Sequence, residues 1–399
     1  MTIADPSLSG RWRPQPAATA GDGSPFTLAT RALAILTLIL LLKHAGQFFA
    51  FPADRAMAGP EDLVVFHAIG DFAARDALAS AYDPATFAAA LPAANKGAHW
   101  LNPPHAALLF SPFSAVPYSV AKAFWLGLTL AATIAGAMLA AGRRSVEAAS
   151  ISILSPAFLA GVFAVNLGGI VAGAMIGAMR LAERRPIIAG AFLSFLTIKP
   201  QYGVLIAPYL LASGRWRAIA WGAVLSAVFV GGSLIVHGSA SWMAFFDAMP
   251  AVHAQHGLEM HRGTVNLAQL FVKAGAPAGA ATLAAVLALV AAMIAVYGLA
   301  RRDDGLATIG WVLVLTPLVA PSAWIYDWPV VACGLIALHS AGRLRGGLAI
   351  AAAAAWAAPV IPIFLYGRFA AAAASLSLVG IFAATALAAV NARMKPLSD

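Results

Sequence analysis

Long apolar runs separated by short polar connections form the dominant pattern of this chain. The apolar segments lie near residues 32–50, 118–141, 148–165, 168–181, 187–199, 201–212, 218–236, 278–299, 306–320, 328–341, 346–366 and 369–391. Several approach the length of about 20 residues that an α-helix needs to cross hydrocarbon, and none alternates as a membrane β-strand does. The pattern predicts an all-α, polytopic membrane bundle, in which the short segments 187–199 and 201–212 form a broken or re-entrant pair.

Composition supports a membrane protein and excludes other classes. Hydrophobic residues make up 61% of the 399 residues and charged residues only 10%, which is too little charge for a soluble surface. The net charge of +9 comes from short basic clusters between apolar runs, so it indicates membrane orientation rather than nucleic-acid binding. The single cysteine, Cys333, lies in an apolar run and excludes an internal disulfide.

Arginine clusters on alternate connections set the predicted topology. They are Arg143-Arg144, Arg180 with Arg184-Arg185, Arg215 with Arg217, Arg301-Arg302, Arg343 with Arg345, and Arg393 with Lys395. The positive-inside rule places these connections and both termini in the cytoplasm and predicts about 12 spans in a bacterial inner membrane. Residues 1–28 and 394–399 are predicted to be cytoplasmic tails, the first disordered, around one transmembrane domain over 29–393.

Two long connections, 52–117 and 237–277, then lie on the outer face, where their aromatic residues predict short amphipathic helices. The first carries Asp62, for which two interpretations stay open: a helix start favoured by the dipole, or a general base. Asp76 falls about 40° from Asp62 on a helical wheel and is expected to share its face. Asp71 is expected to pair with Arg75 on one helix face, and Asp83, before a proline, to form a turn.

Polar residues elsewhere on the outer face are further candidates. Lys199 ends an apolar run, where it needs either a partner or a route to the interface, and Pro200-Gln201 favours a broken helix lining a cavity. In the second loop His261 and Arg262 suit anion contact better than metal binding, since the histidine spacing there matches no zinc motif. Asp327, among aromatic residues at a span end, is a further candidate.

These residues resemble the polytopic glycosyltransferases of family 87, in the GT-C superfamily, which include polyprenyl-phosphate-mannose-dependent α-mannosyltransferases. The likeness covers residues 60–335. It rests on Asp62-Leu-Val-Val-Phe-His-Ala, Tyr82-Asp-Pro-Ala-Thr-Phe, Asn102-Pro-Pro-His, Trp125, Lys199-Pro-Gln and Gly214-Arg-Trp-Arg, in that order. The resemblance implies a polyprenyl-phosphate sugar donor, a lipid or glycan acceptor, inversion at the sugar, and Asp62 as the general base.

The same resemblance implies that Lys199 neutralises the leaving donor phosphate, and His261 and Arg262, as anion contacts, are candidates to bind it as well. Neither a metal nor another cofactor is expected, since cationic side chains can serve. Substrate-pocket candidates are Asp76, Asn102, Gln201, Asn266, Tyr326 and Asp327. One departure stands out: many members read Ser-Pro-x-x-Trp-x-His-His, where this chain has Tyr326-Asp327 in place of the two histidines. The departure puts the mannose donor and the phospholipid acceptor in doubt. It also leaves open a non-catalytic membrane protein, and a transporter or lipid flippase is the main alternative.

Overall fold

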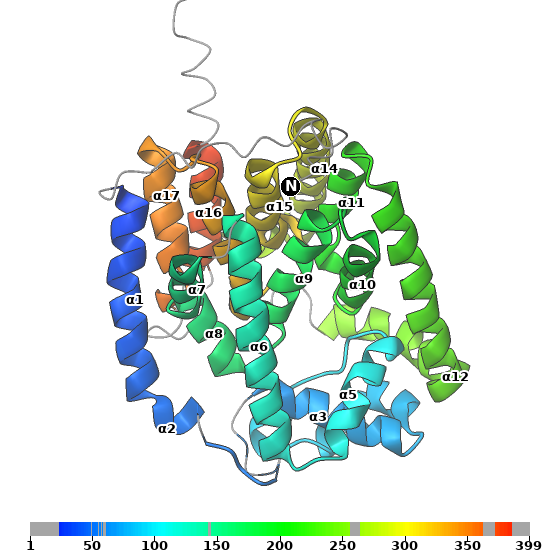
Figure 1. The fold of residues 1–399 in the computed structure, drawn as a ribbon. Coiled ribbons are helices and arrows are strands. Elements are labelled where there is room, and N and C mark those ends of the chain that lie inside the picture. Colours follow the sequence, from blue (N-terminus) through cyan, green and yellow to red (C-terminus); the bar gives the residue numbers. More distant parts are fainter. Residues whose placement is uncertain are drawn as a thin grey trace, which may run out of the picture.

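Apolar helices make up nearly all of the regular structure in a computed structural model of the protein (Figure 1). The structure describes residues 24–48, 50–54, 56, 58, 61–142, 145–255, 264–361 and 372–384. Within these ranges the named elements are α-helices and 3-10 turns, and one isolated bridge joins Thr264 to Trp324. The all-α prediction is therefore confirmed.

The helices have the following bounds. They are α1 (Pro25–Lys43), α2 (Ala45–Phe48), α3 (Asp62–Ala74), α4 (Pro84–Ala89), α5 (Ala107–Ser114), α6 (Tyr118–Ala141), α7 (Val146–Ile153), α8 (Pro156–Ala164), α9 (Gly168–Arg180), α10 (Pro186–Leu196), α11 (Ile206–Ala212), α12 (Trp216–Gln255), α13 (Leu267–Lys273), α14 (Ala278–Arg302), α15 (Leu306–Val319), α16 (Pro329–Ser340) and α17 (Gly346–Ala357). A last apolar helix spans Ala372–Ala384. The 3-10 turns are η3 (Leu78–Tyr82), η4 (Ala93–Asn95), η5 (Pro104–Ala106), η6 (Pro200–Tyr202) and η7 (Ile325–Asp327).

Four of these helices, α1, α6, α12 and α14, are long and apolar enough to cross a membrane, and a fifth span results if α7 and α8, bent by 53°, count as one. Other apolar helices have 10–17 residues, which is short of the about 20 that a straight span requires. The prediction of about 12 full spans is therefore not confirmed, because breaks interrupt several apolar runs. The pair 187–199 and 201–212 is broken as predicted, by η6 between α10 and α11.

The long helices lie at the periphery, and the shorter ones form the core. Only 11% of the most apolar window of α12 and 17% of that of α14 is buried, and exposed side chains such as Ile235 and Ile294 suit contact with lipid tails. In contrast, nearly every residue of α15 and α16 is buried. Gly310 and Gly334 let these two helices touch: a Cβ on either would lie 2.9 Å from the other's carbonyl oxygen.

At one end of the bundle, the first predicted outer region, 52–117, folds into α3, α4 and α5 with the turns between them (Figure 1). Most residues of α3 are buried, so this helix packs against α5 within the protein rather than lying along an interface. The second predicted region, 237–277, begins inside α12: Gly238, with φ of 71°, kinks the helix, which continues to Gln255. The Trp242 indole donates to the Ser233 hydroxyl across this kink at 3.1 Å.

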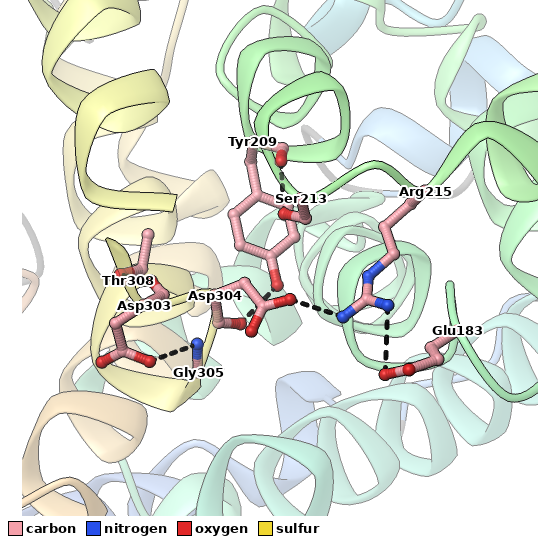
Figure 2. Close-up of polar contacts among 8 residues, drawn as sticks. All are labelled: Glu183, Tyr209, Ser213, Arg215, Asp303, Asp304, Gly305 and Thr308. Atoms are coloured by element: carbon pink, nitrogen blue, oxygen red, sulfur yellow. Dashed lines mark hydrogen bonds and ion pairs between the residues drawn. The ribbon is translucent and has the colours of Figure 1, made fainter. Parts of the chain in front are cut away.

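At the opposite end, three connections between helices are tied together by Arg215 (Figure 2). Its guanidinium lies 3.1 Å from a Glu183 carboxylate oxygen and 2.5 Å from one of Asp304. The Tyr209 hydroxyl donates to the Asp304 backbone carbonyl at 2.7 Å, and the Gly305 amide donates to Asp303 at 2.9 Å. Among the described residues, this end holds Arg184-Arg185, Arg215 with Arg217, and Arg301-Arg302, which the positive-inside rule assigns to the cytoplasm.

The predicted tails fall mostly outside the described residues. Of 1–28, the structure describes residues from Ser24 onward, and α1 begins at Pro25, capped by the Ser24 side chain, which accepts from the Thr27 amide at 3.2 Å. Residues 394–399 lie outside the described ranges.

Candidate active site

Four polar residues from four separate segments meet beside the start of α3. The Asn166 amide donates to the Asp62 carboxylate, and the Asn166 carbonyl oxygen accepts from the Lys199 ammonium at 3.4 Å. That ammonium also lies 3.1 Å from a carboxylate oxygen of Asp327. Asp62, Asn166, Lys199 and Asp327, called here the polar cluster, therefore form a continuous chain of contacts that joins two carboxylates through an amide and a cation.

Asp62 is the first residue of α3, and Glu61 caps the helix with extended backbone. A carboxylate is favoured there by the helix dipole, as the sequence predicts. Desolvation by burial raises the pKa of Asp62, while the hydrogen bond from Asn166 and the charge of Lys199 lower it in part. The net rise makes this carboxylate a stronger proton acceptor than an ordinary aspartate.

Asn166 lies in the break between α8 and α9. Val165 ends α8 in the left-handed region, with φ of 46° and ψ of 48°, which is strained for a β-branched residue. This turn stops α8 and directs the next side chain toward Asp62. The Asn166 side-chain carbonyl also accepts from the Leu167 amide, which fixes its orientation.

Gly168, the first residue of α9, lets η7 approach this break. A Cβ at this position would lie 1.9 Å from the Tyr326 carbonyl oxygen. No side chain fits there, because real Cβ atoms do not approach backbone oxygen so closely. Gly168 therefore brings Asp327, at the end of η7, next to Lys199.

We expect Gly168→Ala to destabilise the protein by about 1–3 kcal/mol or more, because η7 or α9 must move. Gly298→Ala in α14 is the matched control, since nothing lies within 4 Å of a Cβ there. It should be neutral or stabilising by up to about 1 kcal/mol, as alanine favours helix over glycine. Thermal unfolding in detergent measures both variants; equal melting temperatures would contradict the close approach.

Lys199 follows α10 and precedes Pro200, which starts η6. Its ammonium is enclosed by aromatic rings as well as by Asp327: it lies 5.2 Å from the ring centre of Tyr326 and 5.9 Å from that of Tyr202. The Lys199 side chain is 11% exposed and that of Asp327 only 2%. The predicted need for a partner is thus met inside the protein.

The segment that carries Asp327 is fixed by hydrogen bonds. The Trp324 amide donates to the second Asp327 carboxylate oxygen at 3.2 Å, and the Val265 amide donates to the Ala323 carbonyl at 2.9 Å. Asn266 donates to the Pro321 carbonyl at 2.7 Å while its own carbonyl caps α13. The described end of the second loop therefore clamps the turn that supplies Asp327.

Comparison with known protein families identifies the class to which this chain belongs. Residues 100–321, more than half of the chain, match the model of glycosyltransferase family 87. The chain belongs to glycosyltransferase family 87. No curated protein and no solved structure matches it significantly.

Family 87 membership makes the chain a membrane glycosyltransferase and confirms the resemblance seen in the sequence. The matched range includes Asn166 and Lys199. Asp62 and Asp327 lie outside it, so their roles rest on the geometry of the polar cluster.

The polar cluster contains three of the site residues predicted from the sequence, namely Asp62, Lys199 and Asp327. Tyr326 adjoins them, since its hydroxyl lies within electrostatic range of both aspartates. Gln201 is half-buried in η6, beside Lys199 in the chain.

Other predicted residues have different surroundings. Asp76 is not on the helix face of Asp62: α3 ends at Ala74, and Asp76 is exposed with φ of 55°, so the helical wheel does not extend to it. The Asn102 backbone carbonyl accepts from the Tyr82 hydroxyl at 2.8 Å. Asn266 acts as a helix cap, as above. His261 and Arg262 lie outside the described residues.

Asp83 forms the predicted turn at the exposed start of α4. Its carboxylate accepts from the Thr86 amide at 2.7 Å, and hydrogen bonds from the Thr86 side chain and from this amide lower the pKa of Asp83. Asp83 therefore has a capping role.

Asn166 was not among the site residues predicted from the sequence. Its signal was faint: a single amide between two apolar runs, followed by Gly168-Gly169. Polar side chains at such helix breaks line cavities in membrane proteins, and this general rule was the one available clue.

His105 is a second residue that the predicted site omitted. The Thr197 hydroxyl donates to the Ser194 carbonyl, so His105 Nε2 donates to Thr197 Oγ1, 3.0 Å away. Its ring stacks on Trp242 with centroids 5.7 Å apart. Burial lowers the pKa of His105 to about 4, so the ring is neutral near pH 7. It therefore supports the turn before Lys199 as a hydrogen-bond donor rather than as a cation.

Proposed function

We propose that this family 87 enzyme transfers a sugar from a polyprenyl-phosphate donor to a lipid or glycan acceptor on the outer face of the inner membrane, with inversion. One observation carries the proposal: a carboxylate with a raised pKa, Asp62, lies in the same cluster as the Lys199 ammonium. Inverting transfer needs these two groups, a base for the acceptor and a cation for the leaving phosphate.

In the proposed reaction, the acceptor hydroxyl oxygen attacks the anomeric carbon of the sugar while its proton passes to Asp62. The bond between that carbon and the phosphate oxygen breaks on the opposite side, and the polyprenyl phosphate leaves with the electron pair. Lys199 stabilises the charge that develops on this oxygen. Asn166 holds the base and the cation in a fixed relation, since it contacts both.

The charges of the polar cluster favour a singly charged donor. Two carboxylates face one ammonium, so the cluster repels a nucleotide diphosphate, with its several negative charges, more strongly than a donor with one charge. A polyprenyl-phosphate sugar is a phosphodiester with one negative charge. The apolar surfaces of α12 and α14 are suited to the lipid phase in which such a donor is dissolved.

A transfer assay tests the donor. Purified enzyme in nanodiscs receives either a labelled polyprenyl-phosphate hexose or the matching nucleotide sugar, with bacterial membrane lipids as acceptors. We expect a glycosylated product from the polyprenyl donor alone, with the opposite anomeric configuration by NMR. Transfer from the nucleotide sugar, a retained configuration, or donor movement across the bilayer without a new glycosidic bond would overturn the proposal.

We also expect transfer to persist in excess EDTA. The Lys199 ammonium contacts Asp327 directly and is joined to Asp62 through Asn166, so a cation already offsets part of the charge of the two carboxylates. Among the described residues there is no group of three or more potential metal ligands of the His, Cys, Asp and Glu types. Activity lost to EDTA and restored by Mg²⁺ or Mn²⁺ would assign the leaving-group charge to a metal instead.

A further inference from the structure

A buried ion pair lies directly beside the start of α3. The Lys122 ammonium is 2.6 Å from one carboxylate oxygen of Glu61, and the Tyr118 hydroxyl donates to the other at 2.9 Å. Lys122 also donates to the Ala50 carbonyl at 2.9 Å. Glu61, Tyr118 and Lys122 are called here the clasp; it joins the chain after α2, the cap of α3 and the first turns of α6.

The clasp is costly, and fold stability alone does not account for it. The Lys122 side chain is 2% exposed and that of Glu61 is 14% exposed, so both charges have lost most of their water. Replacing such a pair with apolar residues is often neutral or stabilising.

What the clasp does provide is a fixed position for Glu61, whose neighbour in the chain is Asp62. The Glu61 carbonyl accepts from the Val64 amide at 3.2 Å and from the Asn95 side chain at 3.2 Å. The side chain and the backbone of Glu61 are therefore both held, which leaves the first turn of α3 little freedom to rotate. The geometry between Asp62 and Asn166 depends on that turn.

We infer that the clasp is a positioning device, in which Lys122 and Tyr118 act through Glu61 to hold Asp62 against Asn166 and within reach of the acceptor hydroxyl. The inference rests on the proposed function, because it assumes that Asp62 is the base. Glu61, Tyr118 and Lys122 are positioning residues and do not touch the reacting atoms.

A pH profile separates this role from a general effect on folding. The groups that face Asp62 are Asn166 and Lys199, with Asp327 and Tyr326 within electrostatic range. A loosened α3 admits water to the carboxylate, which weakens the desolvation that raises its pKa. The acidic limb of kcat then moves to lower pH, whereas a purely structural defect lowers the amount of active enzyme without moving the limb.

Three variants test the inference in graded steps. Tyr118→Phe removes one hydrogen bond and keeps the ion pair. Glu61→Gln removes the charge and keeps the shape. The double variant Glu61→Gln with Lys122→Met removes both charges, so neither is left buried without its partner.

Because a displacement of about 1 Å can cost on the order of 10²-fold, we expect kcat to fall by that order in the double variant and by less in Tyr118→Phe, with donor KM little changed. Arg215→Gln is the control, since it breaks the ion pairs of Arg215 with Glu183 and Asp304 at the opposite end of the bundle (Figure 2). It should lower the melting temperature but leave kcat per folded molecule and the acidic limb unchanged.

The outcomes distinguish the inference from the function on which it rests. If the clasp variants keep the wild-type kcat and acidic limb while Asp62→Asn is inactive, the clasp has no positioning role and the proposed base stands. A limb shift and reduced kcat in the clasp variants, with unchanged values in Arg215→Gln, support the inference. If Asp62→Asn remains active, the proposed base is wrong and the inference fails with it.

Discussion

Asp62→Asn is expected to lower the rate of sugar transfer by about 10²–10⁴-fold, the range that a general base contributes. Asparagine has nearly the same shape as aspartate and still reaches Asn166, but its amide does not accept the proton of the acceptor hydroxyl. The measurement is kcat for labelled transfer in nanodiscs, normalised to folded protein by size-exclusion chromatography.

The pH dependence of the wild-type enzyme also tests whether Asp62 is the general base. A general base works only when deprotonated, so the rate rises with pH through the pKa of Asp62. Because burial raises this pKa above the ordinary value of 3.8, the acidic limb should lie above that value, and Asp62→Asn should remove it from the residual activity. Residual activity that keeps the wild-type limb would assign the limb to another group.

The stability of Asp62→Asn, unlike its rate of transfer, should equal or exceed that of the wild-type enzyme at pH 7. A carboxyl whose folded-state pKa is raised stabilises the fold at low pH and costs stability once pH exceeds the folded-state pKa. Removing that charge should leave the melting temperature at pH 7 unchanged or higher. Asp83→Asn is the matched control: Asp83 is exposed, caps α4, and asparagine caps equally well, so both rate and stability should be retained.

Three candidate residues named from the sequence lie together in the structure, whereas the predicted number of spans is not confirmed. Asp62, Lys199 and Asp327 lie far apart in the chain and were named for different reasons. Asp62 is a carboxylate on the predicted outer face, Lys199 is a charge at the end of an apolar run, and Asp327 lies among aromatic residues at a span end. Family likeness added the roles of the first two. Their meeting point was not predictable, since it depends on Asn166 and on the left-handed turn at Val165. An isolated amide and a valine carry no local signal for such a turn.

Two errors of detail have the same physical origin. Apolar runs show where helices form but not where they break, so the run 148–165 was predicted as one segment, whereas α7 and α8 are bent by 53°. The face predicted for Asp76 assumed that α3 continues, whereas the chain turns left-handed there. Lys122 was not a candidate, because it lies within the apolar run 118–141 and the sequence alone does not show that Glu61 contacts it.

The second large effect is expected at Lys199. Lys199→Met should lower kcat by about 10²–10³-fold, the cost of losing one preorganised electrostatic contact to the developing charge. It should also destabilise the protein by about 3–5 kcal/mol, because the buried Asp327 carboxylate is left without its cation. The two losses have different causes and are separable by a second substitution.

Lys199→Met combined with Asp327→Asn separates them. The double variant has no unpaired charge, so its melting temperature should recover most of what the single variant loses, while transfer stays low because the leaving phosphate still lacks a cation. Asp327→Asn alone keeps the ammonium and should keep measurable transfer. If the double variant regains both stability and transfer, Lys199 serves only to neutralise Asp327, and the charge on the leaving phosphate must be stabilised by another group.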